Sequence, residues 1–169
     1  AMLLLNNDTR LAPTCLAELA AALDAHPEAA AIGPMVYTWD GWNTISSAGG
    51  MINWAHADAV NVGAGEPDSG QYAARAVDFL NGCALLVRST AVAQVGLLDE
   101  KFYWGSEDVD YCFRMHHAGW GVLYTPEPAI IHAIGSSTSQ VVVRTIIRTH
   151  RRMYRLHSKH PARNPLSRG

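Results

Sequence analysis

The sequence has few cysteines and no long apolar run. Its three cysteines, Cys15, Cys83 and Cys112, are far apart and form no Cys-x-x-Cys pair, which favours neither a disulfide framework nor a zinc knuckle. No apolar run approaches the roughly 20 residues that cross a bilayer. The short run at residues 2–5 lacks the basic leader and cleavage site of a signal peptide. We therefore expect a reduced, cytoplasmic globular protein without a transmembrane helix.

Acidic residues are absent after Glu127, so the charge is divided unevenly along the chain. Residues 141–169 carry eight of the thirteen Lys and Arg residues. Residues 1–140 carry five basic and fifteen acidic residues, a formal charge of −10 against +8 for the tail. The 169 residues are enough for one core. We predict a domain over residues 1–138, followed by a basic helix and tail over residues 139–169.

What the sequence does contain is an alternation of short apolar runs and amphipathic segments, which predicts a mixed α/β fold. The unbroken apolar run at residues 2–5 predicts a buried strand. Gly33-Pro34 interrupts the next strand, 31–37, and argues for an edge or a bend. Further strands are expected at residues 77–80, 84–88, 121–124 and 129–132, with a small hairpin between residues 43 and 54. Helices are expected at residues 13–25, 89–96, 107–117 and 139–157, with Ser89 and Ser106 as N-caps.

Polar side chains follow the first and last of these strands and begin one helix. Asn6-Asn7-Asp8 follows the first strand, and His132 ends the last. Ligands bind outside the carboxyl ends of strands in open α/β sheets. Glu107 and Asp108 begin a helix, where the macrodipole favours anions. One Asp, one His and a diphosphate would suit Mn²⁺ or Mg²⁺.

Each of these features also has a structural explanation. Asn6-Asn7-Asp8 is typical of a turn before a capped helix. Glu107 and Asp108 are explained equally by charge complementarity at a helix start, and His132 by a hydrogen-bonded core histidine. No single motif decides between the explanations.

The order of the motifs resembles that of family 2 glycosyltransferases, GT-A-fold enzymes that use nucleotide-sugars, from Leu3 to about His160. It is most similar to the rhamnosyltransferase-like branch, which builds bacterial cell-surface polysaccharides. The matching segments are Leu3-Leu-Leu-Asn-Asn-Asp-Thr9, Gly63-x-Gly with Gly70-Gln71-Tyr72, Val77-Asp-Phe-Leu-Asn-Gly-Cys-Ala-Leu-Leu-Val-Arg88, Val95-Gly-Leu-Leu-Asp-Glu-Lys-Phe102, Ser106-Glu-Asp-Val-Asp110, Arg114, Gly119-Trp120 and Ile131-His132.

The resemblance implies inverting transfer of a sugar from a nucleotide-diphospho-sugar donor to an acceptor hydroxyl. Asn6-Asn7-Asp8 takes the place of the family's Asp-x-Asp motif, with Asp8 a ligand of Mn²⁺ or Mg²⁺ and His132 completing the metal site. Asn6 departs from the fully acidic motif and lowers the local negative charge. Asp108 matches the general base, and Glu107 places it or the acceptor. Donor or acceptor contacts are implied for Asn6, Asn7, Asn81, Gly82, Tyr103, Trp104 and Arg114.

In the family, the segment before the Asp-x-Asp strand supplies much of the nucleotide-binding sheet, and this sequence lacks it. We therefore expect the later part of a GT-A fold, with a mixed sheet flanked by helices and the N-terminal nucleotide-binding half absent. The isolated chain should be weakly active or inactive. Residues 2–5 should form an exposed apolar edge strand, a template for pairing with another chain. We predict a homodimer or higher association through this edge, which a monodisperse monomer in light scattering would contradict.

Two other functions are compatible with the sequence. The chain could be a non-catalytic remnant that serves as an interaction module. Alternatively, the basic C-terminal helix could bind an anionic membrane surface, although a solvated helix packed on the domain explains its charges equally. Aromatic interleaving in this helix is limited to Tyr154, so we expect no nucleic-acid binding. Because acceptors of the branch are carbohydrates, often lipid-linked, peripheral contact with the inner membrane face is also expected.

Overall fold

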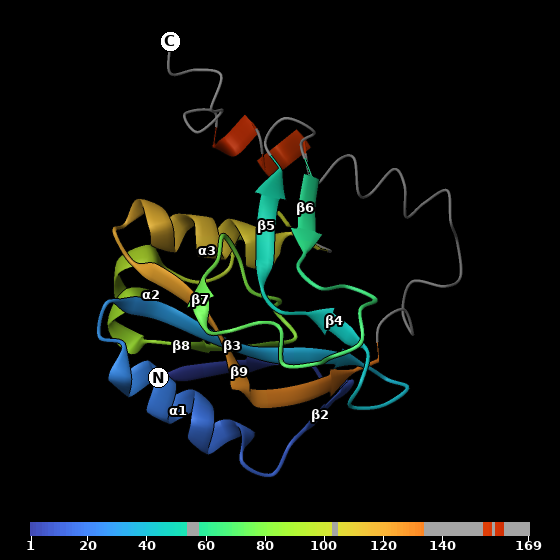
Figure 1. The fold of residues 1–169 in the computed structure, drawn as a ribbon. Helices are drawn as coiled ribbons and strands as arrows, with labels where there is room; N and C mark the ends of the chain where they lie inside the picture. The colour runs from blue at the N-terminus through green and yellow to red at the C-terminus, as the bar shows by residue number, and fades with distance from the viewer. Residues whose placement is uncertain (54–57, 103–104, 134–153, 157, 161–169) are drawn as a thin grey trace.

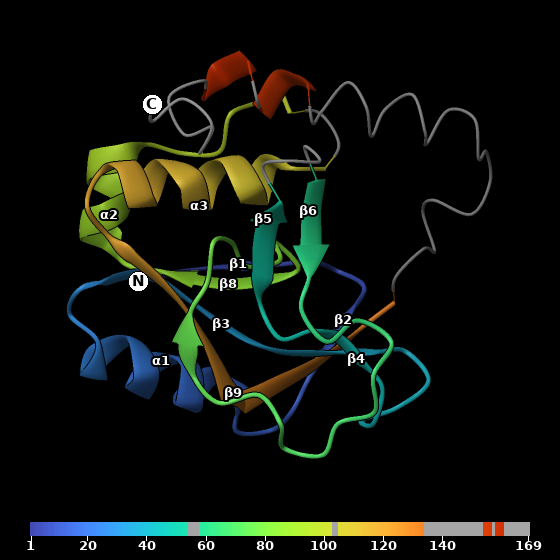
Figure 2. The same ribbon diagram turned by 45° about the horizontal axis from the view of Figure 1, so that its top comes forward.

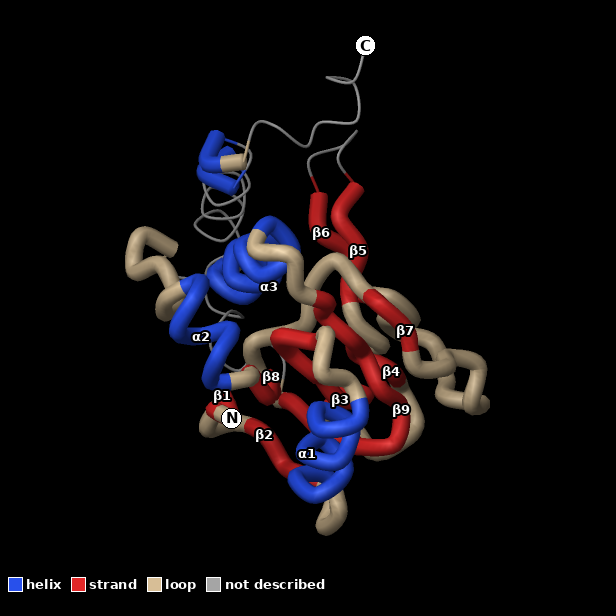
Figure 3. Tube along the Cα trace, turned by 90° about the vertical axis from the view of Figure 1, so that its left-hand side faces the viewer, coloured by secondary structure: helices blue, strands red, loops and turns tan. Residues whose placement is uncertain are grey.

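The computed structural model describes residues 1–53, 58–102, 105–133, 154–156 and 158–160. Its strands are β1 (Met2–Leu5), β2 (Thr9–Leu11), β3 (Ala29–Thr38), β4 (Ile45–Ser47), β5 (Gly50–Asn53), β6 (Asp58–Asn61), β7 (Arg75–Ala76), β8 (Ala84–Val87) and β9 (Gly121–His132). Its helices are α1 (Cys15–Ala25), α2 (Ser89–Val95) and α3 (Glu107–His117). The main sheet is mixed and runs in the order β1-β8-β3-β9-β2, with β4 on β3 and β7 on β9 (Figure 1). A separate hairpin, β5–β6, projects from it (Figure 3).

Two apolar layers enclose the sheet, one under α1 and one under α2 and α3 (Figure 2). Strand β8 is buried along its whole length because its side chains pack in both layers. Leu85 and Val87 join the layer beneath α3, whereas Ala84 and Leu86 join the layer beneath α1. Alternate residues of a strand point to opposite faces, so a strand between two layers reads as an unbroken apolar run.

Strand β3 is central rather than an edge strand, which corrects the prediction from Gly33-Pro34. It pairs antiparallel with β8 on one side and parallel with β9 on the other. The pairing with β9 is irregular between Gly33 and Met35, where Pro34 lies, and the missing proline N–H is accommodated there. Gly33 also makes room for Leu80, since a Cβ on Gly33 would lie 2.5 Å from Leu80 Cδ2.

Other predicted elements are shifted or merged. Residues 121–132 form one strand, β9, and Pro126 and Pro128 fall at its irregularity opposite Gly33 and Met35. The expected strand at residues 77–80 is replaced by the short β7. The expected hairpin between residues 43 and 54 is also wrong, because β4 pairs with β3 and β5 pairs with β6. Strand β2 was not predicted. The expected helix at residues 139–157 lies mostly outside the described residues, and 154–156 are helical.

Strand β1 is an edge strand, as predicted, but it is half-buried with Leu5 exposed, so the prediction of a buried strand at residues 2–5 is wrong. It pairs antiparallel with β8 from Met2↔Val87 to Leu5↔Ala84, and in the described part of the chain no strand pairs with its other side. Leu3 packs on one apolar layer and Leu4 on the other. Association through this edge stays a prediction. None of the helices in the described ranges has both the length and the apolar character of a membrane span.

Asp110 ties α3 to the C-terminal segment. Its fully buried carboxylate lies 2.9 Å from Arg114 Nε, 2.9 Å from Lys159 Nζ and 2.9 Å from His160 Nε2. Burial alone would raise the pKa of Asp110, but hydrogen bonds from Lys159, His160 and Arg114 outweigh it and hold the pKa below its ordinary value. Leu156 is also fully buried. The described part of the C-terminal segment is therefore packed on the domain.

We predict that Asp110→Asn destabilises the fold by about 3 kcal/mol, because it removes the buried negative charge that Arg114 and Lys159 contact. This is the lower end of the usual range, since both cations are partly exposed and Lys159 keeps Asp99 at 2.6 Å. Urea unfolding at neutral pH measures the change. Asp24→Asn on the exposed face of α1 is the matched control and should change stability little.

The effect of Asp110→Asn on the free energy of unfolding should depend on pH. The folded pKa of Asp110 is lowered, so its carboxylate contributes stability above the unfolded pKa of about 4, and that stability is lost as the pH falls through the folded pKa. The difference between the natural chain and Asp110→Asn should therefore shrink below about pH 4. An equal difference at neutral and strongly acidic pH would contradict the role given to this carboxylate.

Candidate functional site

The pairing of β1 with β8 brings the start of the Asn6-Asn7-Asp8 motif beside Gly82 and Cys83. Leu5 pairs with Ala84 at the end of the ladder, and the Asn6 N–H donates to the Cys83 carbonyl at 3.0 Å. Because the strands are antiparallel, the residue after β1 lies beside the residues before β8. The sheet register therefore fixes the position of Asn6.

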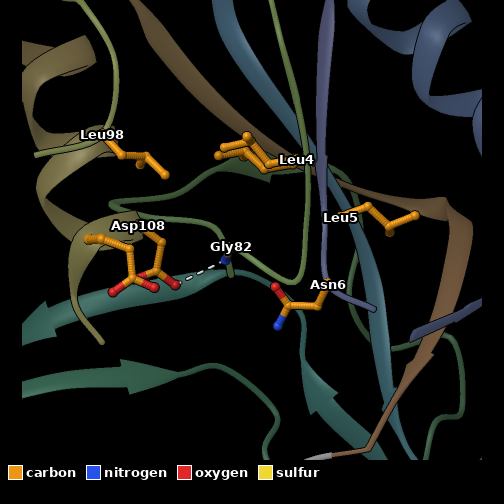
Figure 4. Close-up of a pocket in the computed structure, with 8 residues that line it drawn as sticks. Leu4, Leu5, Asn6, Gly82, Leu98 and Asp108 are labelled. Atoms are coloured by element: carbon orange, nitrogen blue, oxygen red, sulfur yellow. Dashed lines mark hydrogen bonds between the residues drawn. The ribbon is translucent and has the colours of Figure 1, made fainter. Parts of the chain in front are cut away.

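Asp108 reaches the same segment from the first turn of α3 (Figure 4). Its Oδ2 accepts a hydrogen bond from the Gly82 N–H at 2.9 Å, and its Oδ1 accepts one from the Val109 N–H at 2.8 Å. A Cβ on Gly82 would lie 3.3 Å from the Asp108 Cβ, so the absence of a side chain permits this approach. The two backbone donors fix the orientation of the carboxylate.

The turn before α3 has an unusual backbone. Ser106 is the N-cap, as predicted, but its side chain makes no capping hydrogen bond. Its φ is 67°, in the left-handed region that residues other than glycine, asparagine and aspartate rarely adopt. Such conformations cluster at functional sites, where the surrounding structure maintains them.

Asn6, Gly82, Glu107 and Asp108 line one pocket of about 190 Å³. Its apolar wall comes from Leu4, Leu5, Leu85 and Leu98, and Figure 4 shows the Asn6 amide and the Asp108 carboxylate on the same side of the pocket. A few convergent polar groups on an apolar wall are typical of a small-molecule site. The structure thus brings together both predicted catalytic carboxylates and two of the predicted binding residues.

Asp8 and His132 meet beside this pocket. Asp8 Oδ1 lies 3.3 Å from His132 Nε2, and the two side chains are 31% and 19% exposed. Thr9 pairs with His132 across β2 and β9, which holds the neighbouring Asp8 in place. Asn6 Nδ2 is 3.4 Å from His132 Nε2. Asn6 therefore contacts His132, one of the two predicted metal ligands, and also lines the pocket of Asp108.

The Asp8 and His132 side chains fit a divalent cation in ligand type and spacing. Carboxylate and imidazole together suit Mn²⁺, and carboxylate suits Mg²⁺. Two ligands at about 2.1 Å in adjacent octahedral positions lie about 3.0 Å apart, close to the observed 3.3 Å. In the described ranges, no group of three or more His, Cys, Asp and Glu side chains could hold a metal. Two protein ligands leave coordination positions for phosphate oxygens and water.

Cys83 is part of the site in a way that the sequence analysis missed. It is 4% exposed. Burial, followed by the negative charges of Asp108 and Asp8, raises the pKa of its thiol to about 12. At neutral pH the thiol is therefore uncharged and unreactive, and it packs as a small apolar group in the layer beneath α1.

The remaining predicted contacts are not brought to the pocket. Arg114 binds Asp110 and donates to the carbonyls of Val95 and Leu97 at 2.6 and 2.9 Å, so it holds α3 against the loop after α2. Asn81 Nδ2 lies 3.4 Å from Asn61 Oδ1. Their roles in donor or acceptor binding stay predictions.

Three predicted binding residues remain, Asn7, Tyr103 and Trp104. Asn7 is exposed in the turn after β1. Tyr103 and Trp104 lie outside the described residues. The sequence analysis missed Leu98, although it lies in one of the matching segments.

A family model described as glycosyltransferase like family 2 matches residues 1–155. The chain belongs to glycosyltransferase family 2. Two curated relatives, both named N-acetylglucosaminyl-diphospho-decaprenol L-rhamnosyltransferase and both from Mycobacterium tuberculosis strains, are 30% identical over 164 residues. The alignments cover 88% of this chain and 52% of each relative. The chain thus spans about half the length of the curated relatives it matches.

A solved structure of GalNAc-T7 with UDP, GalNAc and Mn²⁺ has the same fold, with a TM-score of 0.63 and 15% identity. The match covers 92% of this chain and 31% of that one. At this identity, the likeness shows the fold alone. This family 2 glycosyltransferase chain therefore has a mixed sheet with flanking helices, similar to a GT-A glycosyltransferase, as the sequence predicted.

We predict that Gly82→Ala impairs glycosyl transfer without unfolding the chain. The added Cβ would crowd Asp108 and displace its carboxylate, and small misplacements of a reacting group cost roughly 10–100-fold in rate. Release of nucleoside diphosphate measures the rate, and thermal unfolding measures the stability. Gly121→Ala is the control, because its Cβ would meet the nearest atom at an ordinary 3.5 Å. Equal rates for the two variants would contradict the importance of this approach.

Proposed function

We propose that the chain carries the metal and acceptor side of an inverting glycosyltransferase, which moves a sugar from a nucleotide-diphospho-sugar to an acceptor hydroxyl. The observation that carries the proposal is the position of Asn6, which is 3.4 Å from His132 and also lines the pocket of Asp108. One residue thereby connects a candidate cation site with a candidate base. Family membership supports sugar transfer as the reaction.

In this proposal, Asp108 is the general base. Its carboxylate lines the pocket, and the Gly82 and Val109 N–H groups hold it in a fixed orientation there. It takes the proton of the acceptor hydroxyl while the acceptor oxygen bonds to the anomeric carbon and the bond from that carbon to the diphosphate oxygen breaks. Attack opposite the leaving group inverts the anomeric carbon. Glu107 lines the same pocket and orients the acceptor.

Asp8 and His132 would hold Mn²⁺ or Mg²⁺ beside the diphosphate. The cation, when bound, offsets the negative charge that grows on the departing nucleoside diphosphate. Asn6 is neutral where the fully acidic motif has a carboxylate, so it adds no repulsion against the diphosphate. Its amide can donate a hydrogen bond to a phosphate oxygen.

The proposed biological role is cell-surface polysaccharide synthesis with a carbohydrate or lipid-linked acceptor. The name of the curated relatives, which specifies rhamnosyl transfer and a decaprenol diphosphate, supports this class of substrates. Peripheral contact with a membrane would suit such an acceptor and stays a prediction. Of the described C-terminal basic residues, Lys159 and His160 bind Asp110, and the exposed Arg155 lies over the Phe102 ring.

Variants in the two halves of the site should affect different quantities, the turnover rate for Asp108 and the binding of Mn²⁺ with UDP for Asp8. Asp108→Asn should lower turnover by about 10²–10⁴, the usual contribution of a general base, and leave binding of Mn²⁺ with UDP nearly unchanged. Asp8→Asn should weaken that binding. Isothermal titration and release of nucleoside diphosphate give the two readouts, and Asp24→Asn is the matched control.

A near-normal turnover of Asp108→Asn would refute its role as base. Unchanged binding of Mn²⁺ and UDP by Asp8→Asn would refute the cation site. The roles of the base and of the cation site can therefore be refuted separately.

A further inference from the structure

Two exposed tryptophans lie near the proposed site without a role in it. Trp39 is 60% exposed and Trp42 is 44% exposed, both in the connection between β3 and β4. Figures 1 and 2 both show this connection beside the end of β9. Thr38, the residue before Trp39, pairs with His132. Large apolar side chains left exposed together mark interaction sites more often than isolated ones do.

The backbone holds these tryptophans in a fixed turn. The Thr38 N–H donates to the Thr44 carbonyl at 3.0 Å, and the Gly41 N–H donates to the Thr38 carbonyl at 3.3 Å. A second loop supports the turn, because the Asp68 N–H donates to the Asn43 carbonyl at 2.7 Å. A turn fixed in advance loses little conformational entropy when it binds a ligand.

Two acidic side chains are bound to residues next to the tryptophans. Trp42 packs edge-to-face with Tyr37, with ring centroids 5.9 Å apart and planes at 74°. The Tyr37 hydroxyl donates to the Asp68 carboxylate, and the Thr38 hydroxyl donates to the Asp40 carboxylate. The surface thus combines apolar ring faces with hydrogen-bond acceptors that carry negative charge.

We propose that Trp39 and Trp42 form a subsite for a pyranose ring of the saccharide acceptor, an inference that rests on the proposed function. A pyranose has an apolar C–H face that matches an indole ring and a rim of hydroxyls that can donate to Asp40 and Asp68. A diphosphate would be repelled by these carboxylates. A hydrocarbon chain would desolvate them without replacing their hydrogen bonds. A neutral sugar can pack on the indole rings and also donate hydrogen bonds to the two carboxylates.

The subsite can be tested by NMR on the full chain with ¹⁵N-labelled tryptophan. Methyl β-N-acetylglucosaminide and methyl α-L-rhamnoside are the probes, and open-chain sorbitol is the control ligand. At least one glycoside should shift the indole N–H signals of Trp39 and Trp42. The signal of Trp120 should stay unchanged, because its indole N–H donates to Gln94 at 2.8 Å near α2 and α3.

Variants identify the stacking interaction. Trp39→Ala should raise the apparent dissociation constant of the glycoside by about 3–10-fold, the usual value of one aromatic contact, and Trp39→Tyr should retain most of the affinity. Trp120→Phe is the matched control. Light scattering of Trp39→Ala should show an unchanged association state.

Three outcomes would overturn the subsite. These are the absence of a shift at both tryptophans with either glycoside, equal shifts with sorbitol, and a loss of self-association in Trp39→Ala without an effect on glycoside binding. The last would make the surface an interface between copies of the chain. Glycoside binding is measured without turnover, so it can be absent while Asp108→Asn still lowers transfer, and it can persist if Asp108→Asn transfers normally. A failure of the subsite can therefore be distinguished from a failure of the proposed function.

Discussion

Two adjacent residues, Gly82 and Cys83, hold the two halves of the site together through their backbone groups. The Cys83 carbonyl accepts the Asn6 N–H at 3.0 Å, and the Gly82 N–H binds the Asp108 carboxylate at 2.9 Å. The first contact continues the pairing of β1 with β8, and the second fixes the start of α3. A shift of the β1–β8 register by one residue would turn the Asn6 side chain to the other face of the sheet. The site therefore depends on this register.

The rest of the fold stabilises that arrangement. Strand β8 is buried between two apolar layers, so the segment before it has little freedom to move. Helix α3 is held at Arg114 by the carbonyls of Val95, the last residue of α2, and of Leu97 in the loop after it. Lys159 and His160 hold it at Asp110. The proposed base, Asp108, thus lies at the start of a rigid helix, while the proposed sugar contacts, Trp39 and Trp42, lie on a hydrogen-bonded turn. Functional groups on rigid elements are held more accurately than those on free loops.

The sequence predicted the elements whose signals are local. The apolar run of β1, the helix at 107–117 and the order of the motifs were sufficient to predict the fold class and the pocket residues Asn6, Gly82, Glu107 and Asp108. Pairing partners were not predictable, because they depend on contacts far apart in the chain. Strand β2 has only three residues, and β3 became central despite Pro34 because an irregularity in its pairing accommodates the proline. Two partners of Asp110, Lys159 and His160, lie 49 and 50 residues away in sequence. Arg114 binds Asp110 and backbone carbonyls instead of lining the pocket.

If Asp8, His132 and Asp108 belong to one site joined through residues 82–83, Mn²⁺ bound with UDP should broaden the amide signals of all three regions, because paramagnetic broadening falls steeply with distance from the ion. We expect strong broadening at residues 6–9 and 132, clear broadening at Gly82 and Cys83, and none at Asp24 near the end of α1. Broadening centred elsewhere, or at Asp8 and His132 without any effect at Gly82, would contradict a single shared site.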